Sequence, residues 1–102
     1  MEFITSTQAI YPGIPLQGLS MVYLYTEWCI PCHMMASVID NLREYGDTVI
    51  IPINIEKDHE GAAFFQVYDI PTCMLFKNAK MVWQHSGIVS ETVLRKMIEL
   101  NQ

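Results

Sequence analysis

Positive charge is scarce in this sequence. Six lysines and arginines stand against eleven aspartates and glutamates, for a formal net charge of −5. The basic residues form no cluster, and there is no run of like charges. A phosphate backbone or an anionic membrane surface would repel such a chain. We therefore expect neither nucleic acid nor a membrane among its partners.

Long apolar runs and cysteines are also few. No run approaches the roughly 18 apolar residues that a membrane-spanning helix needs. The opening stretch MEFITSTQAIYPG lacks the positive and continuous apolar segments of a secretory signal. The three cysteines (Cys29, Cys32 and Cys73) are too few for a secreted scaffold held together by disulfides, and an odd number cannot all pair within the chain. These absences favour the reducing cytoplasm, although a mature chain that had lost its signal would look the same.

Apolar material is plentiful. Hydrophobic residues make up 51% of the 102 residues and charged residues 17%, which excludes intrinsic disorder. We find no linker, repeat or low-complexity tract, so we expect a single domain over residues 1–102.

The apolar pattern predicts alternating strands and helices. MEFITST suits a short edge strand, and MVYLY (21–25) suits a strand buried on both faces. Pro31 fits the first position of a helix, and apolar residues then recur at the spacing of one helical face. Further strands are expected at 48–55, 72–76 and 81–85, with helices capped by Asp58 and Ser90. This order is that of an α/β protein with a parallel β–α–β unit and a late antiparallel hairpin.

The stretch TEWCIPCHMM carries the clearest chemical signal. In the predicted arrangement Cys29 stands just before a helix and Cys32 lies in its first turn. Free N–H groups and the helix dipole then favour a thiolate at Cys29, which is the species that attacks disulfides. Cys32 can attack the resulting mixed disulfide, and Pro31 stiffens the ring that the two sulfurs close. The pair predicts a dithiol–disulfide exchange centre.

Two other interpretations of the pair are weaker. A structural zinc site needs four ligands, but Cys73 stands alone, and His33 neighbours Cys32 on a helix, where adjacent residues face different directions. Two unreactive core thiols would suit the middle of a helix better than a strand-to-helix junction. We therefore expect no metal.

Three segments of the sequence resemble thioredoxin. EWCIPCHMM is similar to the family's W-C-G-P-C-K-M, YDIPTCMLFKNAK to its I-P-T-L-x-x-F-K-N-G, and GIVSETVLRKMI to its glycine and final helix. The likeness covers about Met21 to Leu100, with the motifs in the family's order. It implies the thioredoxin fold: a central mixed β-sheet of four to five strands flanked by helices. It also implies a protein-disulfide reductase.

The resemblance implies partners as well as a fold. The redox-active group would be the Cys29–Cys32 disulfide itself, with no bound cofactor. An NADPH-dependent flavoprotein, thioredoxin reductase, would recharge it, and protein disulfides would be its substrates. On this basis we expect a cytoplasmic monomer that serves electron transport and cell redox homeostasis.

The family's site residues can be carried over one by one. Cys29 matches the attacking cysteine and Cys32 the resolving cysteine. Ile70 and Pro71 match a dipeptide with a cis bond, which turns the backbone of Ile70 outward for a substrate strand. Gly87 matches a glycine that lets substrate approach closely. For Pro71 the alternative is an ordinary trans proline at the start of a strand.

Trp28 matches the tryptophan that shields the disulfide, although plain packing would also explain it. Together with Ile30, Ile70 and Ile88, Trp28 would form a small exposed apolar patch around Cys29. Such a patch suits the docking of unfolded or extended protein substrates.

Two positions depart from the family. It buries an aspartate on the strand before the motif and pairs it with a lysine on the next strand, but these positions hold Tyr23 and Pro52. Losing one charge alone would strand the other in the interior, so their joint loss makes physical sense. We expect Tyr23 to lie beneath the site with its hydroxyl hydrogen-bonded, and Cys32 to lack a carboxylate base. Release of the mixed disulfide should then be slower at neutral pH and rise with pH.

Other replacements predict local differences. Pro52 predicts a bulge, or a first strand too short to reach it, because a central strand cannot spare an amide hydrogen. Ala79 replaces the glycine of the usual Asn-Gly turn, which disfavours a two-residue type I′ loop. Cys73 is expected to be an inert core thiol beneath the site, with a third redox-active thiol as the alternative. His33 is expected to face solvent.

Two rival functions stay open. An isomerase or oxidase of an oxidising compartment would carry the same motif, because the reduction potential cannot be read from the sequence. A thioredoxin-fold adaptor with vestigial cysteines is favoured by the missing aspartate and lysine. The retained cysteine pair, proline and glycine count against the adaptor.

Overall fold

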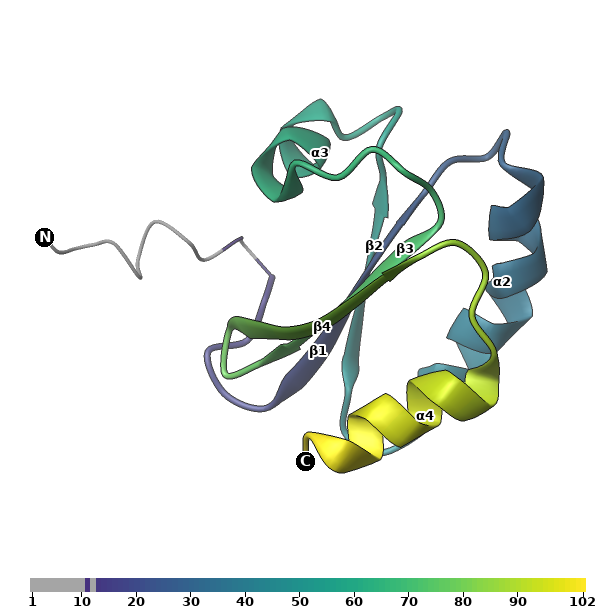
Figure 1. Cartoon of the computed structure of the whole chain (residues 1–102). Coiled ribbons are helices and arrows are strands. Elements are labelled where there is room, and N and C mark those ends of the chain that lie inside the picture. The colour runs from purple at the N-terminus through teal and green to yellow at the C-terminus, as the bar shows by residue number, and fades with distance from the viewer. Residues whose placement is uncertain (1–10, 12) are drawn as a thin grey trace, which may run out of the picture.

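The computed structural model describes residues 11 and 13–102, so the edge strand expected at MEFITST lies outside the described residues. Four strands form one mixed sheet in the order β2-β1-β3-β4 (Figure 1). The strands are β1 (Leu19–Tyr25), β2 (Val49–Asn54), β3 (Thr72–Lys77) and β4 (Lys80–Ser86), and the helices are α2 (Ile30–Leu42), α3 (His59–Phe65) and α4 (Glu91–Leu100). Strand β1 runs parallel to β2 and antiparallel to β3, and β4 pairs antiparallel with β3. The α/β order expected from the sequence is confirmed.

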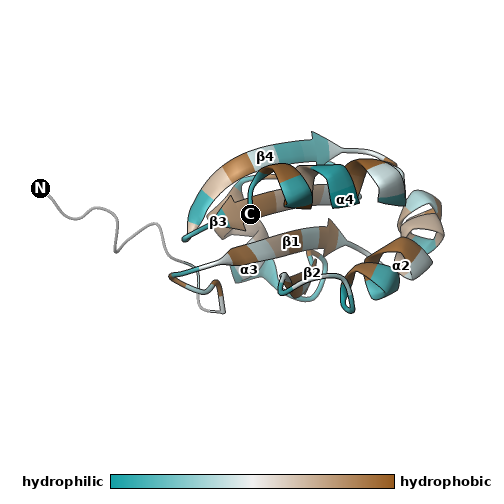
Figure 2. Cartoon of the chain, turned by 90° about the horizontal axis from the view of Figure 1, so that it is seen from below, coloured by the Kyte–Doolittle hydropathy of each residue, from teal (hydrophilic) through white to brown (hydrophobic). Residues whose placement is uncertain are grey.

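Strand alternation divides the core into two layers. Met21 and Tyr23 on β1 belong to the cluster that contains buried residues of α2 and α4. Val22 and Leu24 face the other side and pack with Phe65 of α3. Brown, the apolar colour, is concentrated on β1 and β3, the two central strands (Figure 2). Within the described residues, no helix is long and apolar enough to cross a bilayer.

Helix α2 starts and packs as its sequence predicts. Cys29 is the N-cap residue and a proline occupies the first turn, where a missing N–H costs nothing. Met35, Ile39 and Leu42 are buried along one face. The two other predicted caps are also present. The Asp58 carboxylate accepts a hydrogen bond from the N–H of Gly61, and the Ser90 hydroxyl accepts one from the N–H of Val93.

Of the two alternatives predicted at Pro52, the bulge is wrong, and the short first strand lies outside the described residues. The parallel register of β1 and β2 runs without a shift from Ser20 opposite Val49 to Tyr25 opposite Asn54, with Tyr23 opposite Pro52. Among the described strands β2 lies at the edge of the sheet, and Pro52 is exposed. A proline is tolerated there because the outer side of an edge strand needs no amide donor.

The hairpin between β3 and β4 also corrects an expectation. Asn78 and Ala79 have φ angles of 53° and 68°. Two left-handed residues in a row are the mark of the type I′ turn, which the alanine was expected to disfavour. Tertiary contacts override the local preference, because Asn78 exchanges two hydrogen bonds with Gly18: its N–H donates to the carbonyl at 2.9 Å, and its side-chain oxygen accepts from the N–H at 2.8 Å.

Candidate active site

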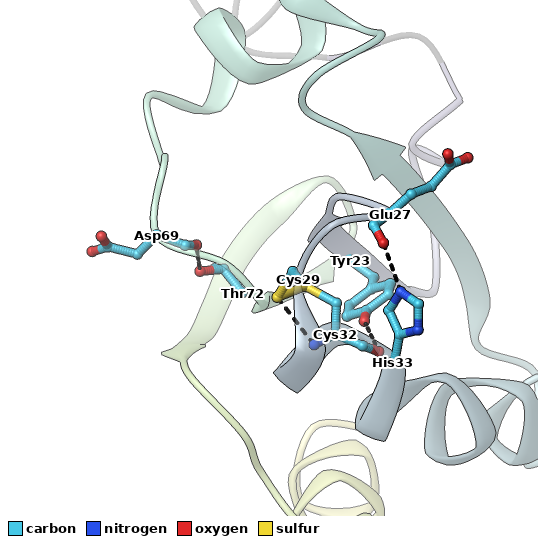
Figure 3. Close-up of a disulfide and its surroundings, with 7 residues drawn as sticks. All are labelled: Tyr23, Glu27, Cys29, Cys32, His33, Asp69 and Thr72. Atoms are coloured by element: carbon cyan, nitrogen blue, oxygen red, sulfur yellow. Dashed lines mark hydrogen bonds between the residues drawn. A yellow bond between two sulfur atoms is a disulfide. The ribbon is translucent and has the colours of Figure 1, made fainter.

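The two cysteines lie where β1 passes into α2 and form a disulfide (Figure 3). Their Cα atoms are 5.1 Å apart. The Cys29 sulfur accepts a hydrogen bond from the Cys32 N–H at 3.1 Å. Cys29 is half-buried, whereas Cys32 is only 3% exposed. An incoming disulfide therefore meets Cys29 first, and the free N–H groups of the helix end favour a thiolate at that position.

Tyr23 lies beneath the disulfide, as expected. Its side chain is 5% exposed, and its hydroxyl donates to the carbonyl of Cys32 at 3.1 Å (Figure 3). Its ring stacks on Tyr25, with centroids 5.3 Å apart and an interplanar angle of 6°. Burial, followed by the nearby Cys73 and Tyr25, raises the pKa of Tyr23 to about 12. The hydroxyl is thus a neutral donor at physiological pH and does not serve as a base.

A cavity of about 390 Å³ opens beside Cys32, between β1, β2 and α2. Tyr23 and Pro52, which replace the family's buried aspartate and lysine, both line it. Its two carboxylates are exposed and each faces a cation: Glu27 lies 3.1 Å from Lys57, and Asp40 lies 3.5 Å from Arg43. No buried carboxylate therefore lies beside Cys32 in this cavity.

The loop before β3 forms the other wall of the site. The Ile70–Pro71 bond is cis, and Pro71 is buried. The Thr72 hydroxyl donates to the carbonyl of Asp69 and is hydrogen-bonded to Ser86 Oγ at 2.9 Å. These contacts hold the loop against the end of β4. Figure 3 shows Thr72 beside the disulfide.

Gly87 adjoins this loop. Its N–H donates to the Pro71 carbonyl at 2.7 Å, and its φ of +99° belongs to the region that favours glycine. A Cβ placed on Gly87 would meet nothing within 4 Å. The backbone conformation, together with open space for a substrate, therefore accounts for glycine here better than crowding within the chain does.

Apolar side chains are exposed on the loops that meet at this end of the sheet. Trp28 is 79% exposed, Ile30 75% and Ile88 51%, while Ile70 is half-buried. An aromatic that the sequence interpretation passed over, Tyr68, is 64% exposed just before the cis-proline dipeptide. Trp28 projects into solvent, so packing within the chain does not explain it.

The remaining predicted residues are placed clearly. Cys73 is fully buried in the core cluster that contains Tyr23, and burial raises the pKa of its thiol to about 12. It is therefore a neutral thiol at physiological pH, as an inert core cysteine would be. His33 is exposed and bonds through Nε2 to the carbonyl of Glu27 at 2.7 Å.

Sequence reasoning missed several supporting residues. Thr72 and Ser86 tie β3 to β4 beside the site, and Tyr25 supports the ring of Tyr23. The signal for Tyr25 was available, because residues two apart on a strand share a face. The Thr72–Ser86 contact depends on the register of the hairpin, which local patterns do not give.

A disulfide at a strand-to-helix junction, beside a cis-proline loop and above a mixed sheet, defines a dithiol–disulfide exchange protein. The thioredoxin family model matches residues 13–100. Thioredoxin of Chlamydia pneumoniae is 34% identical over 82 residues, covering 79% of this chain and 80% of that protein. Thioredoxin of Buchnera aphidicola subsp. Acyrthosiphon pisum is 30% identical over 83 residues, covering 79% and 77%.

Solved structures agree with the sequence comparison. A mutant thioredoxin from Halobacterium salinarum superposes with a TM-score of 0.78 at 27% identity, covering 83% of this chain and 75% of that one. Fasciola hepatica thioredoxin gives a TM-score of 0.76 at 29% identity and covers 85% of each chain. The chain belongs to the thioredoxin family. It has the thioredoxin fold and is a thiol–disulfide oxidoreductase.

Proposed function

We propose that this thioredoxin-family protein is a protein-disulfide reductase in which Cys29 attacks and Cys32 resolves. The observation that carries the proposal is the unequal placement of the two sulfurs. Cys29, the half-buried N-cap residue of α2, can meet a substrate, whereas Cys32 is buried one turn behind it. A two-step exchange requires one accessible sulfur that attacks the substrate and a second sulfur nearby that resolves the mixed disulfide.

In the first step the Cys29 thiolate attacks one sulfur of the substrate disulfide. A mixed disulfide forms, and the other substrate sulfur leaves as a thiolate that takes a proton from water. In the second step Cys32 loses its proton to water and attacks the Cys29 sulfur. The second substrate sulfur leaves as a thiolate and takes a proton from water, so the substrate is released as a dithiol. The substrate has gained two electrons, and the protein, which supplied them, is left oxidised as the Cys29–Cys32 disulfide.

Substrate docking involves the three loops around Cys29. An extended substrate segment pairs with the backbone at Ile70 and passes over Gly87, where no side chain intervenes. Trp28 and Ile30 supply exposed apolar contact. The small number of such residues suits many substrates in extended form better than one folded partner.

The oxidised protein must be reduced again before it can act on another substrate. The disulfide serves as the redox group without a bound cofactor, and an NADPH-dependent thioredoxin reductase returns it to the dithiol. We place the protein in the cytoplasm as a monomer, contributing to electron transport and redox homeostasis. The low cysteine content and the family membership support this assignment.

Resolution by Cys32 sets the pH dependence. A buried thiol without a carboxylate base ionises no more readily than a free cysteine, because burial disfavours the charged form. The rate of insulin reduction should therefore rise between about pH 6 and 9, by at most about tenfold per pH unit while Cys32 is mostly protonated. A flat profile contradicts the absence of a base.

A redox titration tests the reductase assignment itself. The Cys29/Cys32 couple is equilibrated with glutathione buffers, with Cys29→Ser as the control that cannot form the disulfide. A potential near or below the cytosolic glutathione potential is expected for a reductase. A much higher potential indicates an oxidase or isomerase, and the lack of any redox transition indicates an adaptor.

A further inference from the structure

Asp69 is an exposed acid at the edge of the site. It immediately precedes Ile70, and its carbonyl accepts the hydroxyl of Thr72, which in turn contacts Ser86. Its backbone is thus fixed against the end of β4. In Figure 3 the Asp69 carboxylate is directed away from both sulfurs of the disulfide. Its charge therefore faces the surroundings of the site rather than the reacting atoms.

No charged side chain among the described residues compensates the charge of Asp69. Over residues 11 and 13–102, its carboxylate has neither an ion pair nor a hydrogen bond. Glu27 differs, because its carboxylate lies 3.1 Å from the ammonium group of Lys57. Figure 3 places Glu27 and Asp69 on opposite sides of the disulfide. One side of the site is therefore anionic, and the carboxylate on the other side is paired.

We propose that Asp69 selects protein substrates that carry lysine or arginine next to the reacting cysteine. The inference rests on the reductase function proposed above. A substrate segment that pairs with the backbone at Ile70 runs past the neighbouring residue, so a cation on that segment meets the free carboxylate. The net charge of −5 acts in the same direction, because it attracts cationic partners and repels anionic ones.

Three peptides with one internal disulfide test the proposal. They differ only in the residue that follows the second cysteine: lysine, glutamine or glutamate. The reduced protein is mixed with each peptide, and the second-order rate constant is measured by acid quenching and chromatography. The wild type should favour lysine over glutamine by about two- to fivefold, the range set by exposed ion pairs. The preference should shrink in about 0.5 M sodium chloride.

Two variants with the same change in net charge localise the effect. Asp69→Asn should lower the lysine-to-glutamine and lysine-to-glutamate rate ratios toward one, leaving only the part that the remaining net charge supplies. Asp47→Asn, an exposed position just before β2 and so at the opposite end of the sheet, should leave the ratio at the wild-type value.

Each result decides the proposal. Equal rates for the three peptides with the wild type overturn the selectivity of Asp69 but leave the reductase function standing. A ratio that is unchanged in Asp69→Asn, or that falls equally in Asp47→Asn, also overturns it. Failure to reduce any of the peptides, the neutral one included, contradicts the reductase function and the selectivity together.

Discussion

Tyr23 replaces a charged buried group with a neutral one at the centre of the site. Its hydroxyl donates a hydrogen bond to the Cys32 carbonyl. It takes no part in proton transfer, because its pKa of about 12 keeps it protonated. The same position in the family holds a carboxylate that takes up a proton. At the scale of single residues, the protein therefore keeps the two sulfurs and their helix cap, but no buried carboxylate of the described residues lines the cavity beside Cys32.

Removing the Tyr23 hydroxyl should affect stability more than rate. Tyr23→Phe loses one buried hydrogen bond and should lower the unfolding free energy of the oxidised protein by about 1 kcal/mol, measured by denaturant titration. Insulin reduction should not become faster. Tyr25→Phe is the matched control and should change stability by less than about 0.5 kcal/mol, since no hydrogen bond of its hydroxyl is found in the described part of the chain. A gain in rate for Tyr23→Phe would contradict the proposed role.

Cys73 should make the fold sensitive to alkali. Burial raises the pKa of its thiol from 9.0 to about 12, so the folded state holds this proton more tightly than the unfolded state. The resulting stability is complete below pH 9.0 and is lost between pH 9.0 and about 12, at about 1.4 kcal/mol per pH unit.

Denaturant unfolding of wild type and Cys73→Ala across this range measures the effect. The variant should be less stable near neutral pH, because alanine leaves a small void, but its stability should fall less steeply above pH 9.0. Tyr23 adds a further slope above pH 10.0, which should be smaller in the variant because Cys73 is one of the causes that raise the pKa of Tyr23. Equal slopes in the two proteins would show that the thiol of Cys73 ionises as freely as in the unfolded chain.

At the scale of elements, the β3–β4 hairpin shows tertiary contacts overriding a local preference. Ala79 stands in the left-handed region, which costs an L-residue about 1–2 kcal/mol. The contacts of Asn78 with Gly18, together with the pairing of the strands, hold it there. At this turn the residue in the sequence, Ala79, is therefore less favourable for the observed backbone conformation than glycine would be.

Glycine at this turn should stabilise the protein. Ala79→Gly removes the left-handed penalty, partly offset by the extra chain entropy of glycine, for a net gain of about 0.5–1 kcal/mol. Ala63→Gly, at an exposed position inside α3, should instead lose about 1 kcal/mol. Denaturant unfolding distinguishes the two. A loss of stability for Ala79→Gly would mean that the turn does not adopt the type I′ conformation.

At the scale of the whole molecule, three loops far apart in the sequence meet at one end of the sheet. They follow β1, precede β3 and follow β4, and the pairing of Leu24 with Thr72 and of Thr72 with Ser86 brings them together. The disulfide, the cis-proline and the exposed apolar residues lie on these loops or in the first turn of α2. The site is thus a consequence of strand order.

Much of this arrangement could be predicted from the sequence, because its signals are local. The cysteine spacing, the caps Asp58 and Ser90 and the apolar run of β1 each depend on neighbouring residues. The exposed Pro52 and the left-handed Ala79 could not be predicted in the same way. They are determined by the position of β2 at the edge of the described strands and by the register of β3 with β4, and both are non-local.

The pH dependence of alkylation measures directly whether the N-terminus of α2 holds the Cys29 sulfur as a reactive thiolate. The reduced protein is treated with iodoacetamide, and modification of each cysteine is followed by mass spectrometry with free cysteine as reference. Cys29 should react fastest of the three, ahead of free cysteine at neutral pH, with a midpoint below the ordinary thiol pKa of about 8.5. If Cys29 reacts no faster than free cysteine, the helix end does not activate it and the account is contradicted.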